Sequence, residues 1–318
     1  MSKQFKNNHI PAIEKNPLKF FYVRYFGEPK WADQAAQAAD IPRQSVDSQL
    51  INRVDEATKI TWLGHSSFLI QVAGVNFLTD PVFSERVSPM SFAGPKRLVP
   101  LTFDLEDLPN IDFVLISHNH YDHLDENTIK HLGNRTNYFV PEGLKPWFEK
   151  QGIDAQRVNE LAWWDHQTFG AASITATPSQ HWSGRGVFDR NKTHWASWLI
   201  ELGGKRLWFA GDTGYNPYDF KEIGQWAGEI DVALIPIGAY SPRGFMKDQH
   251  VDVAEAIKVH QDVRSKLSIG MHWGTYPLTA EPVMEPAELL DKLTQTQLDD
   301  NSQFIHMAIG ETRVFERE

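Results

Sequence analysis

Short runs of apolar residues, many of them β-branched or aromatic, recur along the chain from residue 59 onward and predict β-strands. The first three runs are residues 59–63, 67–72 and 75–80, and Ala73-Gly74 between the last two predicts a tight hairpin turn. Two short strands are expected near the C-terminal end. The other predicted strands are residues 111–117, 137–140, 172–178, 195–200, 205–210, 231–237 and 266–271.

Helix signals fall between these strands. Residues 125–132 carry Asp125 and Glu126 in their first turn, which favours a helix start because acidic side chains interact well with the N-terminal end of the helix dipole. Strands come first and are then mixed with helices, and this order occurs twice. It predicts an α/β protein in which two sheets pack face to face with helices outside. The other helices are predicted at residues 143–150, 253–260 and 287–293.

Residues 1–55 carry few strand signals and contain two aromatic clusters, Phe20-Phe21-Tyr22 and Tyr25-Phe26. We expect these residues to form an N-terminal extension that packs through its aromatic side chains on a main domain of residues 56–318. Contact of the clusters with a membrane is the alternative, because exposed apolar patches also mark membrane sites.

A second segment without regular structure is the long, proline-bearing connection of residues 81–110. It mixes apolar residues such as Phe92 with the cations Arg86 and Lys96. Such a mixture suits a substrate that has both an acyl part and a phosphate part. Covering an edge of the fold would use the same residues, and the sequence does not separate the two uses.

The composition excludes several classes of protein. The 318 residues are 41% apolar and include 11 Trp and 19 Phe, which is enough for a large core. There is no cysteine, so disulfides and thiolate sites are excluded and every metal ligand must be His, Asp or Glu. A formal net charge of −10 argues against non-specific nucleic-acid binding. No apolar run approaches the roughly 20 residues of a membrane helix, and no hydrophobic signal segment follows the start, so we expect a cytoplasmic protein; peripheral contact with the inner membrane surface stays open.

The densest group of metal-binding side chains is His118-Asn119-His120-Tyr121-Asp122-His123, which follows the predicted strand 111–117. Alternate residues of an extended backbone project to the same side, so His118 and His120 can bind one ion. The turn into the next helix brings Asp122 and His123 towards a second position. Imidazole and carboxylate without thiolate suit zinc or another first-row divalent ion. A polar surface loop is the alternative, but four ligand side chains in six residues favour a site for two metals.

His181, Asp212 and His272 each follow a predicted strand in a Gly-containing loop. Loops at strand ends are where α/β scaffolds commonly assemble chemistry. Asp212 also has a structural interpretation, because Gly-Asp-Thr-Gly is good turn chemistry by itself. His65, between two strands, is interpreted as a residue that supports the ligands rather than as a ligand, because no partner ligand accompanies it.

The order HxHxDH, a lone His, an Asp in Gly-Asp-Thr-Gly and a late His resembles the metallo-β-lactamase-fold hydrolases over residues 58–318. Within that fold, residues 116–125, 236–240, 245–252 and 272–275 resemble N-acylphosphatidylethanolamine-hydrolysing phospholipase D and its bacterial relatives. The resemblance implies a four-layer αββα sandwich, with two packed mixed β-sheets and outer helices.

The resemblance also implies two Zn²⁺ ions, with Asp212 bridging them. It places Gln249 and His250 at the substrate, and Tyr240 lies in a matching segment, so it is a further candidate for substrate contact. A residue at a helix start that bonds nearby backbone is the structural alternative for His250. One zinc ion would be held by His118, His120 and His181, and the other by Asp122, His123 and His272.

The implied reaction is hydrolysis of a phosphodiester by a hydroxide that the two metals activate, with Asp122 and Asp212 among the catalytic residues as metal ligands. His250 would orient the phosphate or protonate the leaving alkoxide. A phospholipid substrate of this type would give phosphatidic acid and an N-acylethanolamine, and a small-molecule substrate is the other class.

Three alternatives use the same residues differently. A lactonase or another C–O ester hydrolase would bind the same metals. A di-iron redox protein of the same fold is disfavoured, because proteins of that branch typically have Glu at the position of His120 and carry an attached flavin domain. A non-catalytic binding protein is disfavoured because all seven expected ligands are present. The sequence leaves open the physiological substrate, the native metal and the oligomeric state.

Overall fold

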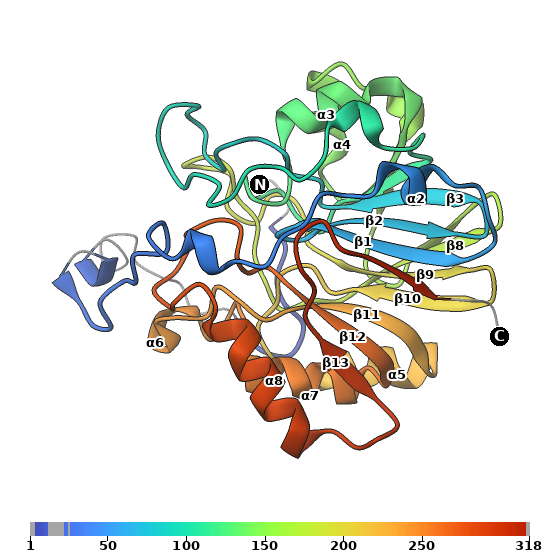
Figure 1. Cartoon of the computed structure of the whole chain (residues 1–318). Coiled ribbons are helices and arrows are strands. Elements are labelled where there is room, and N and C mark those ends of the chain that lie inside the picture. The colour runs from blue at the N-terminus through green and yellow to red at the C-terminus, as the bar shows by residue number, and fades with distance from the viewer. Residues whose placement is uncertain (1–3, 12–21, 25, 316–318) are drawn as a thin grey trace.

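The computed structural model describes residues 4–11, 22–24 and 26–315, and two seven-stranded sheets form the centre of the molecule (Figure 1). The first sheet has the order β14-β1-β2-β3-β4-β5-β6. Its strands are antiparallel from β14 to β3 and parallel from β3 to β6. The bounds are Thr58–Gly64 (β1), Ser67–Val72 (β2), Val75–Thr79 (β3), Phe113–Leu115 (β4), Asn137–Pro141 (β5), Val158–Leu161 (β6) and Thr312–Phe315 (β14).

The second sheet has the order β13-β12-β11-β10-β9-β8-β7 and the same division. Strands β7 to β10 are antiparallel, and β10 to β13 are parallel. Both sheets are therefore mixed, as the family resemblance implied. The bounds are His166–Phe169 (β7), Ala172–Thr177 (β8), Ser197–Leu202 (β9), Lys205–Phe209 (β10), Ile230–Pro236 (β11), Ser265–Met271 (β12) and Gln303–Ile305 (β13).

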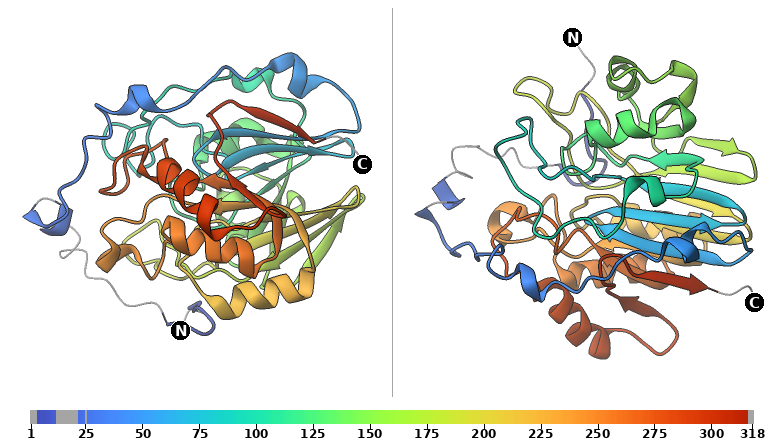
Figure 2. Two further views of the ribbon diagram at one scale, coloured as in Figure 1. Left: turned by 60° about the horizontal axis from the view of Figure 1, so that its bottom comes forward. Right: turned by 45° about the horizontal axis from the view of Figure 1, so that its top comes forward.

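Helices cover both outer faces of the sandwich, and the turned views of Figure 2 show the same layers. Helices α3 and α4 lie over the first sheet, and α5, α7 and α8 lie over the second. The prediction of two packed sheets with outer helices is confirmed. The bounds are Ser48–Asn52 (α2), Glu126–Leu132 (α3), Lys145–Lys150 (α4), Pro217–Ala227 (α5), Arg243–Met246 (α6), Val253–Asp262 (α7) and Glu285–Gln297 (α8).

The continuous apolar runs arise because strands of the first sheet are buried on both faces. In β2, Phe68 and Ile70 point into the core between the sheets, whereas Leu69 between them points into the core under α3 and α4. Successive side chains of a strand alternate between its two faces, so both faces must be apolar. Burying each such side chain stabilises the fold by about 1.5–3 kcal/mol.

The predicted hairpin is present, with Val72 paired with Val75 around Ala73-Gly74. A second hairpin pairs Leu202 with Lys205 around Gly203-Gly204. Both residues of the first turn have positive φ angles, 49° and 78°, which are the values that a two-residue hairpin turn of this kind requires.

The sequence interpretation missed α5, β6 and β7. Helix α5 begins with Asn216 as its N-cap and Pro217 in its first turn, but Gly224 interrupts its buried face. Strand β7 is an edge strand whose residues are mostly exposed and polar, so it lacks the apolar pattern of the other strands. The expected strand 111–117 pairs only over Phe113–Leu115, although its flanking residues are also mostly buried.

The N-terminal region contacts the sandwich at several points. The ring of Phe5 lies 4.4 Å from that of His194, Gln34 Nε2 donates to Glu281 O (2.6 Å), and Ile41 belongs to the larger hydrophobic core. Phe20, Phe21 and Tyr25 lie outside the described residues, and both Tyr22 and Phe26 are exposed. The division of the chain at residue 55 stays a prediction. Among the described residues, no helix has the length and apolar character needed to cross a bilayer.

Candidate metal centre

The loop of residues 118–123 leaves the carboxyl end of β4 and is held on both sides by hydrogen bonds. Before the loop, the backbone N–H of Ser117 donates to Asp80 Oδ1 (2.7 Å). Within it, the N–H of His123 donates to His120 O (3.1 Å) and closes a turn. The loop lies at the end of the sandwich away from the C-terminus (Figure 1), and the side chains of His118 and His123 are buried.

Three imidazoles form a first cluster. His118 Nε2 lies 2.7 Å from His120 Nδ1, and His181 Nε2 lies 3.3 Å from the same atom. Burial lowers the pKa of His118 and His120 well below the usual value, and neighbouring imidazoles lower it further. Burial lowers the pKa of His181 to about 4. All three rings are therefore neutral at pH 7, which is the form that binds metals.

A second cluster lies beside the first. Asp122 Oδ2 is 3.5 Å from His123 Nε2 and 3.4 Å from His272 Nε2. The rings of His123 and His272 are stacked, with centroids 5.2 Å apart. The sequence segment 118–123 thus contributes to both clusters, while His181 and His272 arrive from the loops after β8 and β12.

Asp212, in the loop after β10, lies between the two clusters. Its Oδ2 is 3.1 Å from His123 Nε2, 3.8 Å from His181 Nε2 and 4.0 Å from His118 Nε2. Its Oδ1 is 3.1 Å from His272 Nε2. The carboxylate therefore touches members of both groups, which is the position that a bridging ligand needs.

The two carboxylates control the charge of the second cluster. Burial opposes a positive charge on His123 and His272, but Asp212 and Asp122 raise the pKa of His123 well above its usual value. Asp212 and Asp122 likewise raise the pKa of His272, against burial, to about 9. Burial raises the pKa of both carboxyl groups, but His123, together with His272 and other neighbouring imidazoles, more than offsets burial and holds their pKa well below the usual range. Two buried carboxylates thus require positive charge next to them.

A divalent cation fits this arrangement. His123 Nε2, His272 Nε2 and Asp212 Oδ1 are buried and make no hydrogen bond. Buried polar atoms without a hydrogen-bond partner are rare in folded proteins, and these three converge on one space. Imidazole nitrogen and carboxylate oxygen are ligands of first-row divalent metals, so the residues present fit metal binding.

Asp80 is a residue behind the second cluster that the sequence interpretation missed. It is fully buried, and its Oδ2 accepts hydrogen bonds from His123 Nδ1 (2.6 Å) and from Ser117 Oγ. A carboxylate on the second ring nitrogen fixes the orientation and tautomer of a metal-binding histidine. Its only signal in the sequence is its place at a strand end before Pro81.

His65 contacts the second cluster. Its Nε2 lies 3.1 Å from Asp122 Oδ2, and its ring centroid is 4.0 Å from that of His272. Its ring nitrogen is also close enough to group with Asp122, His123 and His272, so its role as a supporting residue stays a prediction. His65, Asp80 and His272 all have positive φ angles, of 54°, 31° and 63°. Such conformations cost energy in residues with side chains, and they cluster at functional sites.

A cleft of about 470 Å³ opens onto the two clusters. Its lining combines polar residues, among them His120, Asp122 and Asp212, with apolar residues. The ring of Trp182 lies 4.1 Å from that of His120, so polar and apolar residues of the lining are in contact there. The apolar residues, which we call the apolar wall, are Val87, Trp182, Phe245, Met246 and Leu278.

The three predicted substrate residues lie in different places. His250 lines the cleft, and its Nδ1 is 3.9 Å from Asp212 Oδ2. Gln249 also lines the cleft, and its backbone carbonyl accepts a hydrogen bond from His181 Nδ1 (2.9 Å). Tyr240 does not line it: the ring is buried, and its hydroxyl donates to Glu285 (2.6 Å).

Comparison with known proteins agrees with this geometry. The β-lactamase superfamily domain matches residues 75–273. An N-acyl-phosphatidylethanolamine-hydrolysing phospholipase D of Caenorhabditis elegans is 44% identical over 263 residues, which cover 79% of this chain and 74% of the relative. A metal-dependent hydrolase of Carboxydothermus hydrogenoformans is 30% identical over 71% of this chain and 89% of its own length. Some relatives are longer, and the chain spans 51% of one from yeast.

The solved structure of YhfI from Bacillus subtilis, a metallo-β-lactamase fold protein, covers 81% of this chain and all of its own, with a TM-score of 0.55 and 16% identity. At that identity the likeness concerns the fold alone. The family match and the closer relatives carry the further conclusion. The chain belongs to the β-lactamase superfamily and is a metal-dependent hydrolase with the metallo-β-lactamase fold.

Proposed function

We propose that the protein is a dinuclear zinc phosphodiesterase of the phospholipase D type. Its substrates would be N-acylphosphatidylethanolamine-like lipids, and its products phosphatidic acid and an N-acylethanolamine. The observation that carries this proposal is the pair of ligand clusters on either side of Asp212 at the base of a cleft with an apolar wall. The named activity of the C. elegans relative supports it.

In this proposal His118, His120 and His181 would hold one ion, Asp122, His123 and His272 would hold the other, and Asp212 would be a ligand to both. Bound divalent ions lower the pKa of water towards about 7 and neutralise charge on phosphate oxygens. The chain itself keeps the three imidazoles of the first cluster neutral, and it holds the carboxylates of the second ionised.

His250 is proposed to orient the phosphate from the wall of the cleft. Burial lowers the pKa of His250 well below its usual value, and the imidazoles of His181 and His272 add to that effect. A neutral imidazole donates one hydrogen bond but holds no extra proton, so orientation is favoured over protonation of the leaving alkoxide.

The apolar wall suits the acyl part of such a substrate. Val87 brings one residue of the 81–110 connection into this wall, and Phe245 and Met246 bring helix α6 into it. Arg190 also lines the cleft, so a cation lies beside the apolar surface. This combination supports the interpretation that residues 81–110 contact the substrate.

The proposal is tested by metal analysis together with a substrate panel. We expect close to two zinc ions per chain in the active protein, measured by elemental analysis. N-acylphosphatidylethanolamine and a simple phosphodiester should both be hydrolysed, and activity should be lost on chelation and return with zinc. An acyl-homoserine lactone serves as the comparison. Hydrolysis of the lactone with an intact phosphodiester would contradict the proposal and establish the lactonase alternative.

Membrane contact is part of the proposal, because two loops beside the site expose apolar side chains. Phe92 is 78% exposed, and Val187 and Phe188 are 87% exposed each. The segments that carry them, around residues 84–91 and 185–193, line one cavity together. Arg86 and Lys96 lie in the first loop; Lys96 is paired with Glu85 (2.8 Å), so Arg86 is the cation of this loop that would attract anionic headgroups. A cytoplasmic location at the inner membrane surface stays a prediction.

The membrane prediction concerns the tip of the second loop. Changing both Val187 and Phe188 to Asp should weaken binding to vesicles of phosphatidylcholine and phosphatidylglycerol by at least about tenfold, since each apolar side chain contributes about 1.5–3 kcal/mol when buried. Co-sedimentation measures the loss. Val54→Asp is the matched control, because Val54 is 96% exposed and lies near Gly74, at the opposite end of β3 from Asp80. Equal vesicle binding by the two variants would exclude this loop as a membrane contact.

A further inference from the structure

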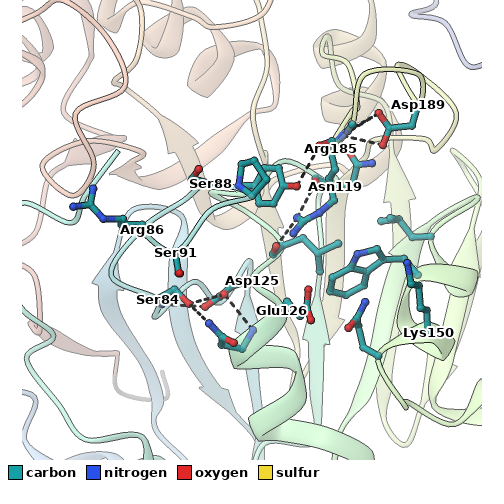
Figure 3. Close-up of a pocket in the computed structure, with 18 of the residues that line it drawn as sticks. Ser84, Arg86, Ser88, Ser91, Asn119, Asp125, Glu126, Lys150, Arg185 and Asp189 are labelled. Carbon is teal, nitrogen blue, oxygen red and sulfur yellow. Dashed lines mark hydrogen bonds between the residues drawn. The ribbon is translucent and has the colours of Figure 1, made fainter. Parts of the chain in front are cut away.

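The segment after His181 folds back onto the metal-binding loop, which we define as residues 118–124. Arg185 Nη1 donates hydrogen bonds to the backbone carbonyls of Asn119 (3.0 Å) and Leu124 (2.7 Å). These carbonyls stand at the two ends of the turn that carries His120, Asp122 and His123. One guanidinium therefore joins the beginning and the end of the turn (Figure 3).

Residues of the metal-binding loop and of the segment after His181 both contribute to this contact. The guanidinium lies 3.9 Å from the ring centroid of Tyr121, and the Tyr121 hydroxyl donates to Arg185 O (3.2 Å). Asn119 Oδ1 accepts a hydrogen bond from the backbone N–H of Gly184 (2.7 Å). The metal-binding loop is thus fastened to residues 184–185 by backbone, side-chain and ring contacts.

The backbone at Arg185 is itself held in place by Asp189. The carboxylate of Asp189 accepts hydrogen bonds from the backbone N–H groups of Arg185 (3.0 Å) and Gly186 (2.8 Å). Figure 3 shows Asp189, Arg185 and Asn119 in this order along one wall of a cavity of about 860 Å³. A side chain that is fixed at its own backbone can fix the geometry of what it binds.

Arg185 lies outside the site itself. It lines the 860 Å³ cavity rather than the 470 Å³ cleft that holds His250. A substrate in that cleft meets His120 and Asp122 but not Arg185. An effect of Arg185 on the reaction must therefore pass through the metal-binding loop.

We propose that Arg185 is a positioning residue that clamps the metal-binding loop, so that His120, Asp122 and His123 keep the spacing that metal binding requires. The proposal rests on the metal-binding part of the proposed function and on no particular substrate. Residues that orient metal ligands from outside commonly change metal affinity or activity by about 10–100-fold when they are lost. Lysine keeps the charge but lacks the planar group that stacks on a ring, so it should replace arginine only in part.

The experiment compares metal retention in full-length wild type, Arg185→Ala and Arg185→Lys, each loaded with Zn²⁺ and then challenged with a chromogenic chelator. We expect Arg185→Ala to bind zinc about 10–100-fold more weakly. Arg185→Lys should lie between it and wild type. The absorption spectrum of the Co²⁺-loaded protein should change in both variants. With any hydrolysed substrate, kcat should fall by a larger factor than KM rises, because Arg185 itself does not line the cleft.

The matched control is Arg206→Ala, which removes an exposed arginine from the ion pair with Glu201 on β9. Zinc affinity in that variant should equal wild type. Wild-type affinity and release rate in a folded Arg185→Ala protein would overturn the clamp. If Arg185→Ala does not fold, wild-type zinc release in Arg185→Lys overturns it, and faster release supports it. A wild-type protein that binds no divalent metal would instead refute the proposed function, so the two failures are distinguishable.

Discussion

Replacing Asp212 with asparagine is expected to reduce kcat/KM by at least about 10³-fold, which corresponds to ~4 kcal/mol of transition-state stabilisation. Asp212 contacts His123 and His272 in one cluster, and it lies within 4.0 Å of His118 and His181 in the other. The amide has no negative charge and offers one oxygen where the carboxylate offers two. The single amide oxygen can bind only one of the two ions. The amount of bound zinc should therefore fall from about two ions per chain to one or fewer.

The fold should survive this change. The side chain of asparagine has nearly the same shape, and the Gly-Asp-Thr-Gly turn retains its glycines. Activity, zinc content and the circular dichroism spectrum are therefore measured on the same sample. Asp291→Asn is the control, because it makes the same chemical change at an exposed residue paired with His306. Two tightly bound ions and wild-type kcat in Asp212→Asn would contradict the bridging role.

Most elements were predictable from sequence in their order along the chain, although α5, β6 and β7 were missed, but the pairing of strands was not predictable. A strand that is buried on both faces, such as β2, has apolar residues at consecutive positions, and such a run is visible in the sequence. Strand β1 instead finds one neighbour, β14, from the far end of the chain, where Thr61 pairs with Thr312. No local pattern encodes a partner about 250 residues away, and exposed edge strands such as β7 carry little apolar signal at all.

Candidate ligands were predictable because each is a His or Asp in a loop directly after an apolar run. The structure brings these side chains together from the loops after β4, β8, β10 and β12. The residues that hold them were harder to find. Arg185 lies between two glycines in a polar segment, and this sequence context predicts an exposed surface cation. Asp80 is 37 residues from Ser117 and 43 from His123, so only the folded chain reveals its contacts.

Asp80 is the centre of a small hydrogen-bond network behind the second cluster. Its Oδ1 accepts from the backbone N–H of Ser117 (2.7 Å), and its Oδ2 accepts from the Ser117 hydroxyl and from His123 Nδ1 (2.6 Å). Three donors thus point at one carboxylate. The proton on His123 Nδ1 leaves Nε2, which lies 3.1 Å from Asp212, free to bind a metal.

We therefore expect Asp80→Asn to impair metal binding at the second cluster by changing the tautomer of His123. Asparagine has a single acceptor oxygen, so its NH₂ group must face either the Ser117 N–H or His123 Nδ1. Because the backbone N–H cannot change, the amide will donate to Nδ1, and the proton of the imidazole moves to Nε2. A protonated Nε2 cannot bind a metal. We expect the ion next to His272 to be lost or to bind at least about 10–100-fold more weakly, while the His118, His120 and His181 cluster keeps its own.

Metal titration with elemental analysis should then give about one zinc ion per chain, with hydrolysis reduced by at least about 10²-fold, or ~3 kcal/mol. Asp112→Asn is the matched control. Asp112 accepts a hydrogen bond from the backbone N–H of Asn76 (2.8 Å), and the single oxygen of an amide can do the same. Two zinc ions of wild-type affinity in Asp80→Asn would show that the tautomer of His123 is set elsewhere. A loss confined to one ion would separate the two clusters energetically, because Asp80 bonds His123 directly and is linked to the first cluster through Ser117 Oγ, which lies 2.9 Å from His118 Nδ1.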